Sequence, residues 1–265
     1  MEPLELLEKK IARKAARAIH EFSMITEGDR VLVALSGGKD SWTLLNVLLR
    51  LRRNSPVKFT VSAATVHPGF PEFDPSPLQK YLSGRGIEYF IERAPLGEII
   101  ENHKTPGTSY CAFCARLRRG VLYTFAKREG FTKIALGHHA DDLIETLLLA
   151  QFFTGEIKSI PPVLLADDGV NVVIRPLCRV FEEEISAYSQ VADFPVISCG
   201  CPPHRTGAEE LNRAKMKKML SELEKGHHGI KANLLSCLGR VRTRYLMQKN
   251  LHILDEGEPC PLKKP

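Results

Sequence analysis

The sequence of 265 residues lacks long apolar runs, repeats and signal-like ends. It has no uninterrupted apolar stretch of about eighteen residues, which is the length that a membrane-spanning helix needs. Residues 1–22 form a charged amphipathic pattern instead of the basic and apolar regions of a secretory signal. The only low-complexity stretch is the polar tail after Asp255. We therefore expect a soluble, cytoplasmic protein that binds no membrane.

Two common phosphate-binding motifs are also missing. Neither G-x-x-x-x-G-K-[ST] nor G-x-G-x-x-G occurs in the chain. What is present is the segment Ser36-Gly37-Gly38-Lys39-Asp40-Ser41, which lies between the apolar run 31–35 and a helical stretch. Glycines allow backbone N–H groups to approach a phosphate, and a helix N-terminus adds its positive dipole end. The segment therefore predicts a nucleotide site.

Net charge is modest and unevenly placed. The chain carries 37 Lys and Arg against 31 Asp and Glu, a net charge of +6. Residues 199–265 hold 13 of these basic residues and 7 of the acidic ones, so the whole net charge lies in this last quarter. Clustered basic residues are typical of a nucleic-acid partner, although a solvated helix face gives the same pattern.

The order of apolar and polar segments predicts an α/β fold. Strands alternate with helices, which favours a parallel, doubly wound sheet of about five strands covered on both faces. Ligands of such sheets bind at the carboxyl ends of the strands. We expect an N-terminal amphipathic helix over 1–22, an α/β domain over 23–198 and a basic, mainly helical segment over 199–265. The strands are expected at residues 30–35, 58–66, 89–92, 133–136 and 172–175.

A second polar motif follows another expected strand end. Gly137-His138-His139-Ala140-Asp141-Asp142 comes directly after residues 133–136. Two acids at a helix start complement the helix dipole, so capping explains them in part. Beside a nucleotide, carboxylate oxygens also suit Mg²⁺. Asp40 and Asp141 are our candidate metal or catalytic carboxylates, and Glu145 lies one helical turn further along.

The seven cysteines are an odd number and include one C-x-x-C pair, Cys111 and Cys114. This usage favours reduced thiols over a disulfide framework. The pair alone is compatible with redox chemistry, with half of a metal site or with coincidence. Cys199 and Cys201 follow another expected strand and supply further ligands. Three thiolates would leave one iron of a cluster open, whereas four would make a closed zinc site. We expect Cys178 and Cys237 to be buried as small apolar residues.

The motif at residues 36–41 resembles the signature of the PP-loop ATP-pyrophosphatases, which split ATP into AMP and pyrophosphate. A longer collinear series between about residues 18 and 199 resembles the tRNA 2-thiocytidine synthetase family. Besides that motif, the series consists of Phe22-Ser23-Met24-Ile25, Glu27-Gly28-Asp29-Arg30, Pro68-Gly69-Phe70-Pro71, CAFCARLRRGVLY from Cys111, KIALGHHADD from Lys133, Pro161-Pro162, Asp167-Asp168-Gly169 and Ile174-Arg175-Pro176-Leu177.

The resemblance implies an adenine nucleotide alpha hydrolase-like fold, ATP, Mg²⁺, a [4Fe-4S] cluster on three cysteines, and a homodimer. The reaction that it implies is adenylation of the C2 oxygen of a tRNA cytidine in the anticodon loop, followed by replacement of that oxygen with sulfur. A tRNA and a sulfur donor system are the implied partners. We expect ATP to contact Ser36, Gly37, Gly38, Lys39, Asp40, Ser41, Val66, Gly137, His138 and Asp142.

Within that reading, Asp40 and Asp141 organise Mg²⁺, and Lys39 stabilises phosphate charge. Cys111 and Cys114 are implied cluster ligands and catalytic residues. The family usually has two residues between its later cysteines, and this chain has one. Cys201 is our preferred third ligand because Cys-Pro there also resembles tRNA 2-thiouridine enzymes, and Cys199 is the alternative at the collinear position.

We expect basic residues near the C-x-x-C pair and in the C-terminal segment to bind the phosphates of the RNA. The residues near the pair are Arg116, Arg118 and Arg119. Three alternatives stay open: thiolation of a uridine, a cluster-free PP-loop ligase of the tRNA lysidine type, and a non-catalytic, metal-stabilised RNA-binding protein. Zinc is the alternative to the cluster.

Overall fold

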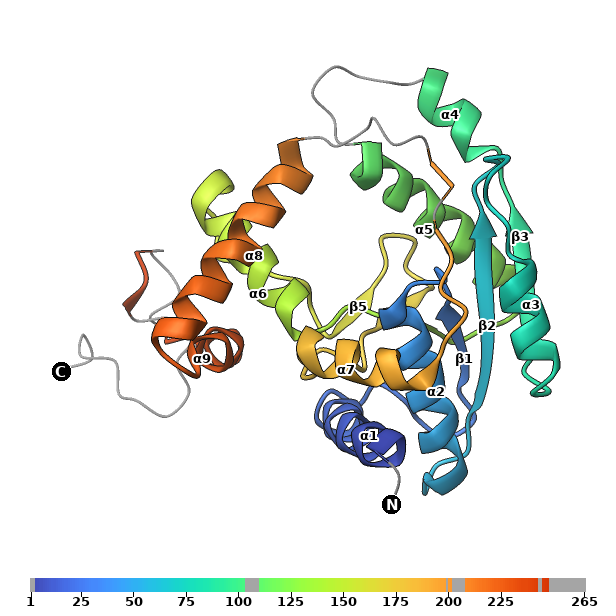
Figure 1. The fold of residues 1–265 in the computed structure, drawn as a ribbon, viewed down its shortest axis with the longest axis horizontal. Coiled ribbons are helices and arrows are strands. Elements are labelled where there is room, and N and C mark those ends of the chain that lie inside the picture. Colours follow the sequence, from blue (N-terminus) through green and yellow to red (C-terminus); the bar gives the residue numbers. More distant parts are fainter. Residues whose placement is uncertain (1–2, 103–109, 199, 202–207, 243–244, 248–265) are drawn as a thin grey trace, which may run out of the picture. The chain divides into compact units, whose positions relative to one another are not determined.

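A computed structural model describes residues 3–102, 110–198, 200–201, 208–242 and 245–247 (Figure 1). The chain divides into two compact units, Met1–Met219 and Leu220–Pro265, and each is considered by itself. The first unit contains the sheet and both predicted loop motifs. The domain boundaries expected from the sequence stay predictions. No helix in the described part of the chain is long and apolar enough to cross a membrane.

The sheet has six strands in the order β3-β2-β1-β4-β6-β5. Five of them lie where the sequence predicts strands, and they pair in parallel. The sixth strand, β5, was not predicted; it is antiparallel to β6. The prediction of a further strand just before Cys199 was wrong, since residues 194–198 have no regular secondary structure. The strands are β1 (Arg30–Ala34), β2 (Thr60–His67), β3 (Tyr89–Arg93), β4 (Lys133–Ala135), β5 (Val163–Leu165) and β6 (Val172–Ile174).

The central strands are apolar because helices cover both faces of the sheet. Val31, Leu32 and Val33 of β1 are fully buried. In β2 every residue between Thr60 and His67 is buried. The predicted α/β class with a parallel, doubly wound sheet is therefore confirmed.

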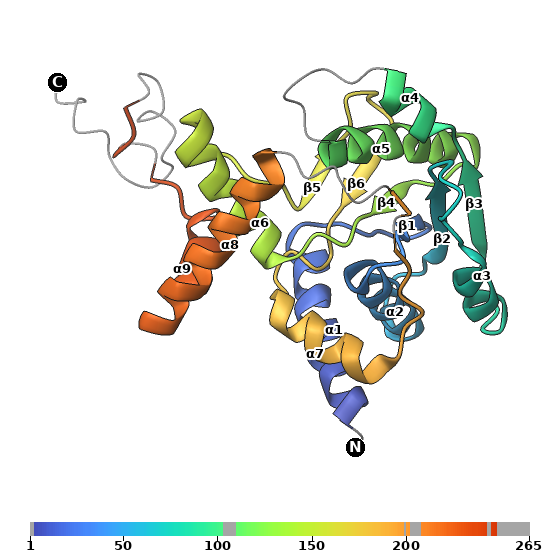
Figure 2. The ribbon, with the colours of Figure 1, turned by 45° about the horizontal axis from the view of Figure 1, so that its top comes forward.

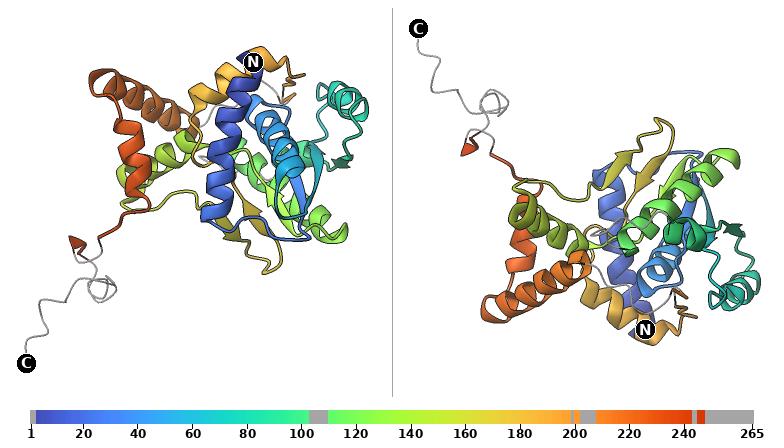
Figure 3. Two further views of the ribbon diagram at one scale, coloured as in Figure 1. Left: turned by 90° about the horizontal axis from the view of Figure 1, so that it is seen from below. Right: turned by 90° about the horizontal axis from the view of Figure 1, so that it is seen from above.

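Helices α1 (Pro3–Glu21), α2 (Lys39–Asn54) and α7 (Glu182–Ala192) pack against one another on one side of the sheet (Figures 2 and 3). Helix α5 (Tyr110–Arg128), with α4 (Leu96–Asn102), covers the opposite side. The remaining helices are α3 (Ser76–Ser83) beside β3, α6 (Ala140–Leu149) with a π turn at Ala150–Thr154, α8 (Ala208–Gly226) and α9 (Ile230–Cys237).

The N-terminal helix α1 belongs to the first unit and is amphipathic as predicted. Ile11, Ala15 and Ala18 on its apolar face are fully buried. On its polar face, the ammonium groups of Lys10 and Lys14 lie 3.1 Å and 2.5 Å from the carboxylate oxygens of Glu184 in α7. This helix therefore packs on the α/β core.

The strand order places a topological switch point between β1 and β4. From β1 the chain builds the sheet outwards through β2 and β3, and it then returns to β4 on the other side of β1. The loops that leave neighbouring strands in opposite directions form a crevice at such a point. Both polar motifs, residues 36–41 and 137–142, follow β1 and β4 directly and therefore meet at this crevice.

Candidate functional site

The loop after β1 has the backbone of an anion cradle. Gly37 adopts a positive φ of 86°, which glycine tolerates best. Gly38 is the N-cap of α2 and offers no side-chain cap to the first helical turn, so the N–H groups there can serve a ligand. The Ser41 hydroxyl donates to the Gly38 carbonyl oxygen at 2.9 Å, and the Ser36 Oγ accepts the Gly38 N–H at 3.3 Å. These residues fit a phosphate group of ATP.

The loop after β4 touches the loop after β1. A Cβ atom on Gly137 would lie 3.1 Å from both the carbonyl carbon of Asp40 and the amide nitrogen of Ser41. That distance is closer than ordinary contact, so a larger residue would push the two loops apart. The two sequence motifs, almost 100 residues apart, therefore form one site.

Lys39 lies between two carboxylates at this site. Its ammonium group is 2.8 Å from Oδ1 of Asp40 and 3.2 Å from Oε1 of Glu182, the first residue of α7. Burial tends to lower the pKa of Lys39, but the hydrogen bond and charge of Asp40 and the charge of Glu182 outweigh it, so the pKa is raised. Lys39 is therefore charged at neutral pH and is held by two carboxylates.

Glu182 was missed by sequence reasoning. It belongs to the run Glu182-Glu183-Glu184, whose only visible signal is that of acids at a helix start. Burial would raise its pKa, but the hydrogen bond from Lys217 and the charges of Lys39 and Lys217 lower that pKa to about 2. Glu182 is therefore ionised at neutral pH and joins α2, α7 and α8 at the site.

Asp141 and Asp142 have different roles. The Asp142 carboxylate accepts the His139 backbone N–H at 3.0 Å, so this residue caps α6 as a first-turn acid can. Asp141 is 3% exposed, and its Oδ2 accepts the backbone N–H of Glu182 at 2.7 Å. The imidazole of His139 lies 3.8 Å from Asp40 Oδ1 and 3.5 Å from Asp142 Oδ2. The gathered carboxylate oxygens have the donor chemistry that Mg²⁺ prefers.

His138 is paired with Arg175, which the sequence showed as part of the motif at 174–177 but not as a site residue. The Arg175 Nε donates to His138 Nδ1 at 3.3 Å, and the Arg175 side chain also donates to the carbonyl oxygen of Pro161 at 2.6 Å. Burial, with the charges of Arg175 and Arg119, lowers the pKa of His138 to about 4. His138 is therefore neutral at physiological pH, with its other ring nitrogen carrying the proton.

Glu145 faces the same cluster, as its spacing suggested. Arg213 of α8 lies 3.2 Å from the Glu145 carboxylate and 3.4 Å from that of Asp142. Burial and the neighbouring charge of Asp142 raise the pKa of Glu145, while Arg213 opposes the shift. Arg175, Arg213, Lys217 and Glu182 are thus the site residues added by the structure.

The C-x-x-C pair lies in the first turn of α5. Cys111 is exposed and Cys114 is 8% exposed, and Cys114 belongs to an apolar cluster that also contains Tyr110 and Phe73. Half-buried Cys201 packs against the same cluster. Cys111 and Cys114 lie one helical turn apart, and Cys201 packs against the same apolar residues. Three thiols in one region have the donor chemistry of a thiolate-bound metal site.

A complete ligand set is not formed within the described residues, where no three His, Cys, Asp or Glu side chains are arranged to hold a metal ion. Cys199 lies outside the described residues. Cys178 is buried as predicted, and burial raises the pKa of its thiol to about 11. The prediction for Cys237 was wrong: this cysteine is exposed, because the short helix α9 has no fully buried residue.

The remaining predicted residues lie near the site or along α5. Val66 is buried near the carboxyl end of β2. Arg116 and Arg119 are exposed, and half-buried Arg118 has an Nε atom without a hydrogen-bond partner among the described residues. Since the charge of Arg119 acts on His138, the cysteine-bearing helix and the loop after β4 are close.

The switch-point crevice, the glycine loop and the paired acidic loop define a nucleotide-binding α/β protein of the PP-loop class. In agreement, a family model of the PP-loop domain matches residues 7–197. The tRNA-cytidine(32) 2-sulfurtransferase of Geobacter sulfurreducens is 47% identical over 246 residues, which cover 93% of this chain and 95% of the relative. The same-named protein of Geobacter metallireducens is 45% identical, covering 92% and 94%.

The chain therefore belongs to the PP-loop proteins, in the family of the tRNA-cytidine(32) 2-sulfurtransferases. Among solved structures, the U34-tRNA thiolase NcsA from Methanococcus maripaludis, determined with its [4Fe-4S] cluster, has a similar fold. The TM-score is 0.72 at 23% sequence identity, with 89% of this chain and 79% of NcsA covered. This likeness agrees with the order of strands and helices described above.

Proposed function

We propose that this protein is an ATP-dependent tRNA thiolase that replaces the C2 oxygen of a tRNA cytidine with sulfur. The observation that carries the proposal is the meeting of the two loops at Gly137, which gathers Lys39, Asp40 and Asp141 at one crevice. The names of its relatives indicate the cytidine at position 32. A tRNA substrate also favours a cytoplasmic location.

ATP supplies the leaving group in this proposal. The C2 oxygen of the cytidine attacks the α-phosphorus, pyrophosphate leaves, and the oxygen becomes part of an AMP ester. A sulfur nucleophile then attacks C2, and AMP leaves with the oxygen. Activation is required because oxide is a poor leaving group, whereas AMP is a good one.

The phosphate loop performs the binding part of this chemistry. The backbone of Gly37 and Gly38 and the hydroxyl of Ser41 face the phosphates, and Lys39 moves from Asp40 and Glu182 to the phosphate oxygens. Charge that develops on pyrophosphate is stabilised by such preorganised donors. Asp40 and Asp141 would hold Mg²⁺, which neutralises phosphate charge when bound. His138 contributes a neutral N–H donor beside them.

Sulfur chemistry is assigned to the cysteines at the start of α5. We propose Cys111, Cys114 and either Cys201 or Cys199 as the ligands of a [4Fe-4S] cluster. Such a cluster, when bound by three thiolates, offers an open iron for a sulfur atom. The exposed Arg116 and Arg119 would hold RNA phosphates near the cysteines. A sulfur donor system and a second copy of the chain are further proposed partners.

The test is an anaerobic reaction with ATP, Mg²⁺, sulfide and an unmodified tRNA transcript. Mass spectrometry of nucleosides is expected to detect 2-thiocytidine, formed together with equal amounts of AMP and pyrophosphate. A matched transcript with uridine at position 32 is expected to stay unmodified at that position. Thiouridine instead of thiocytidine, or an amine adduct, would assign a different substrate or reaction.

The Lys39→Ala variant separates catalysis from RNA binding. We expect product formation to fall by about a hundredfold or more, because one charged group on the phosphates is lost, while tRNA affinity stays close to that of the wild type. A protein that binds tRNA but releases neither AMP nor pyrophosphate would support a non-catalytic RNA-binding role and contradict the proposal.

A further inference from the structure

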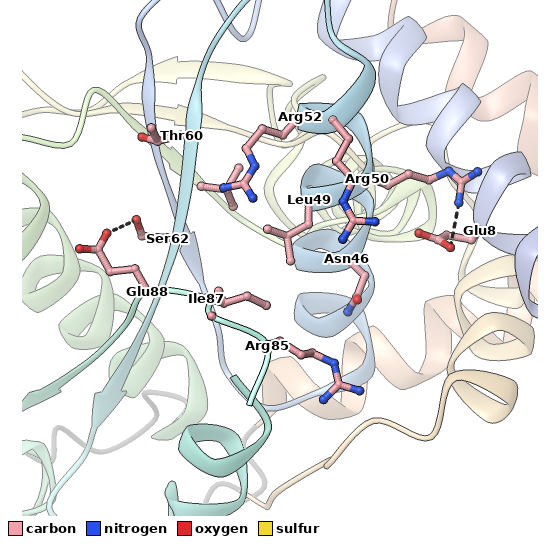
Figure 4. Close-up of a pocket in the computed structure, with 13 residues that line it drawn as sticks. Glu8, Asn46, Leu49, Arg50, Arg52, Thr60, Ser62, Arg85, Ile87 and Glu88 are labelled. Atoms are coloured by element: carbon pink, nitrogen blue, oxygen red, sulfur yellow. Dashed lines mark hydrogen bonds and ion pairs between the residues drawn. The ribbon is translucent and has the colours of Figure 1, made fainter. Parts of the chain in front are cut away.

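A cavity of about 530 Å³ lies at the opposite end of α2 from the phosphate loop (Figure 4). The last turns of α2 form one wall, and the beginning of β2 and the turn before β3 form the other. Thr60 is the first residue of β2, and Glu88 directly precedes β3. The cavity therefore opens at the amino-terminal ends of the strands and is separate from the site at their carboxyl ends.

Four arginines line the cavity: Arg50, Arg52, Arg53 and Arg85. The two lining acids already have partners. The Glu8 carboxylate is 3.1 Å from the guanidinium of Arg50, and the Glu88 carboxylate accepts the Ser62 hydroxyl at 2.6 Å. The arginines are thus in excess over the acids that line the same space.

The excess charge is displayed to solvent. Arg52 and Arg53 are exposed and have no hydrogen-bond or ion-pair partner within the described part of the chain. The guanidinium of Arg85 lies 3.6 Å from the ring centre of Tyr81, which fixes its position without neutralising it. Guanidinium groups match the oxygens of phosphate and carboxylate groups with two parallel hydrogen bonds, so the chemistry of the cavity selects an oxyanion. In a protein whose proposed substrate is RNA, phosphate is the oxyanion at hand.

The position of the cavity on α2 favours a phosphate of the tRNA backbone. Lys39 begins this helix and Arg52 lies near its end, so the two are about 20 Å apart at 1.5 Å per residue. The first part of α2 is buried, so RNA would have to pass over the surface of the domain to contact both ends. A tRNA has a continuous backbone of phosphates that can follow such a surface, and RNA stems are recognised largely through their phosphates and shape.

We propose that this arginine cavity holds backbone phosphates of the tRNA substrate, so that the RNA contacts both ends of α2. The inference rests on the proposed function, because it takes its ligand from it. It adds a second anchor for the RNA, distant from the cysteines and from the basic C-terminal segment.

The test is a salt titration of tRNA binding by the Arg52→Gln/Arg53→Gln variant. Two lost phosphate contacts are expected to make the slope of log affinity against log salt shallower by about 2 and to lower affinity about tenfold at low salt. Arg13→Gln/Arg17→Gln removes two exposed charges from α1 and is the matched control. It is expected to leave the slope unchanged. Unchanged ATP affinity in both variants shows that they are folded.

Arg52→Lys/Arg53→Lys tests charge against loss of a side chain, and it is expected to keep most of the salt slope. Equal slopes in the Gln variant, its control and the wild type would overturn the inference. The Gln variant could also keep its tRNA affinity and lose pyrophosphate binding, as measured by calorimetry. The cavity would then be a site for small anions, and the inference would be overturned as well. If the wild type binds no tRNA at all, the proposed function fails as well. If the wild type thiolates tRNA but the salt slopes of all variants are equal, only the cavity assignment fails.

Discussion

Ile197 covers Gly37 of the phosphate loop. The backbone N–H of Ile197 donates to the Gly37 carbonyl oxygen at 3.2 Å, and a Cβ on Gly37 would lie only 2.3 Å from Cγ1 of Ile197. Close by, the indole N–H of Trp42 donates to the Pro195 carbonyl oxygen at 3.2 Å. The segment that leads to Cys201 is thus fixed to the nucleotide loop, so the two halves of the proposed site constrain each other.

The Gly37→Ala variant is expected to be destabilised and to bind ATP poorly. The residue would suffer both the strain of its positive φ and the clash with Ile197, which together cost about 2 kcal/mol or more. Thermal unfolding and ATP calorimetry measure the two effects. Gly28→Ala is the control, because Gly28 has φ 81° but nothing within 4 Å of a built Cβ. It is expected to lose about 1 kcal/mol from backbone strain alone and to keep ATP affinity.

Ile197→Ala added to Gly37→Ala checks the clash itself. Removing the side chain that a Cβ would meet is expected to restore part of the lost melting temperature. Because Ile197→Ala also removes apolar packing, the loss caused by Gly37→Ala is compared in the wild type and in the Ile197→Ala background. Equal losses in the two backgrounds would show that the contact with Ile197 is not the cause.

The residues that the sequence revealed are those whose signals are local. An apolar strand, paired glycines and a helix start are adjacent in the chain at residues 31–41, so the loop after β1 was predictable. The same holds for the loop after β4. Their contact at Gly137 followed from strand order, because the carboxyl ends of neighbouring parallel strands share one edge.

The residues that the sequence did not reveal reach the site through tertiary packing. Glu182 looks like a helix-start acid and becomes a site residue only because α7 packs beside α2. Strand β5 has three residues on the sheet edge, two of them exposed, and such a short edge strand has no clear alternation. Arg213 depends on the position of α8, about which a local pattern says nothing.

The lowered pKa of Glu182 predicts that the folded protein loses stability in acid. Its pKa is lowered from 4.5 to about 2 in the folded protein, so its contribution is present above pH 4.5 and is lost as the pH falls towards 2. Glu182→Gln is expected to be less stable than the wild type at neutral pH and to lose less stability on acidification in this range. Denaturant unfolding of the protein without ATP or Mg²⁺ measures this. Glu183→Gln, an exposed neighbour in the same turn, is the control and is expected to match the wild type.

The lowered pKa of His138 predicts a separate loss of folding stability at less acidic pH. Because its folded-state pKa is lowered from 6.5 to about 4, the unfolded chain takes up a proton first, and stability falls as the pH drops from 6.5 towards 4. The effect is up to about 3 kcal/mol. His138→Asn keeps an acceptor for Arg175 and is expected to remove this dependence, whereas His20→Asn, at an exposed position of α1, is expected to keep it. An NMR titration in which the His138 ring protonates above pH 6 would contradict the prediction.

Cysteine substitutions separate the proposed sulfur chemistry from ATP binding. Cys111→Ser changes an exposed residue and is expected to lower thiolation by about a hundredfold or more and to reduce bound iron and sulfide, while ATP affinity stays unchanged. Cys237→Ser, also exposed, is the control and is expected to keep both activity and iron. Separate Cys199→Ser and Cys201→Ser variants identify the third ligand, since only one of them is expected to lose iron. Full thiolation by Cys111→Ser, or an active protein that contains zinc without iron, would rule out the proposed cluster chemistry, because the open iron requires thiolates at these positions.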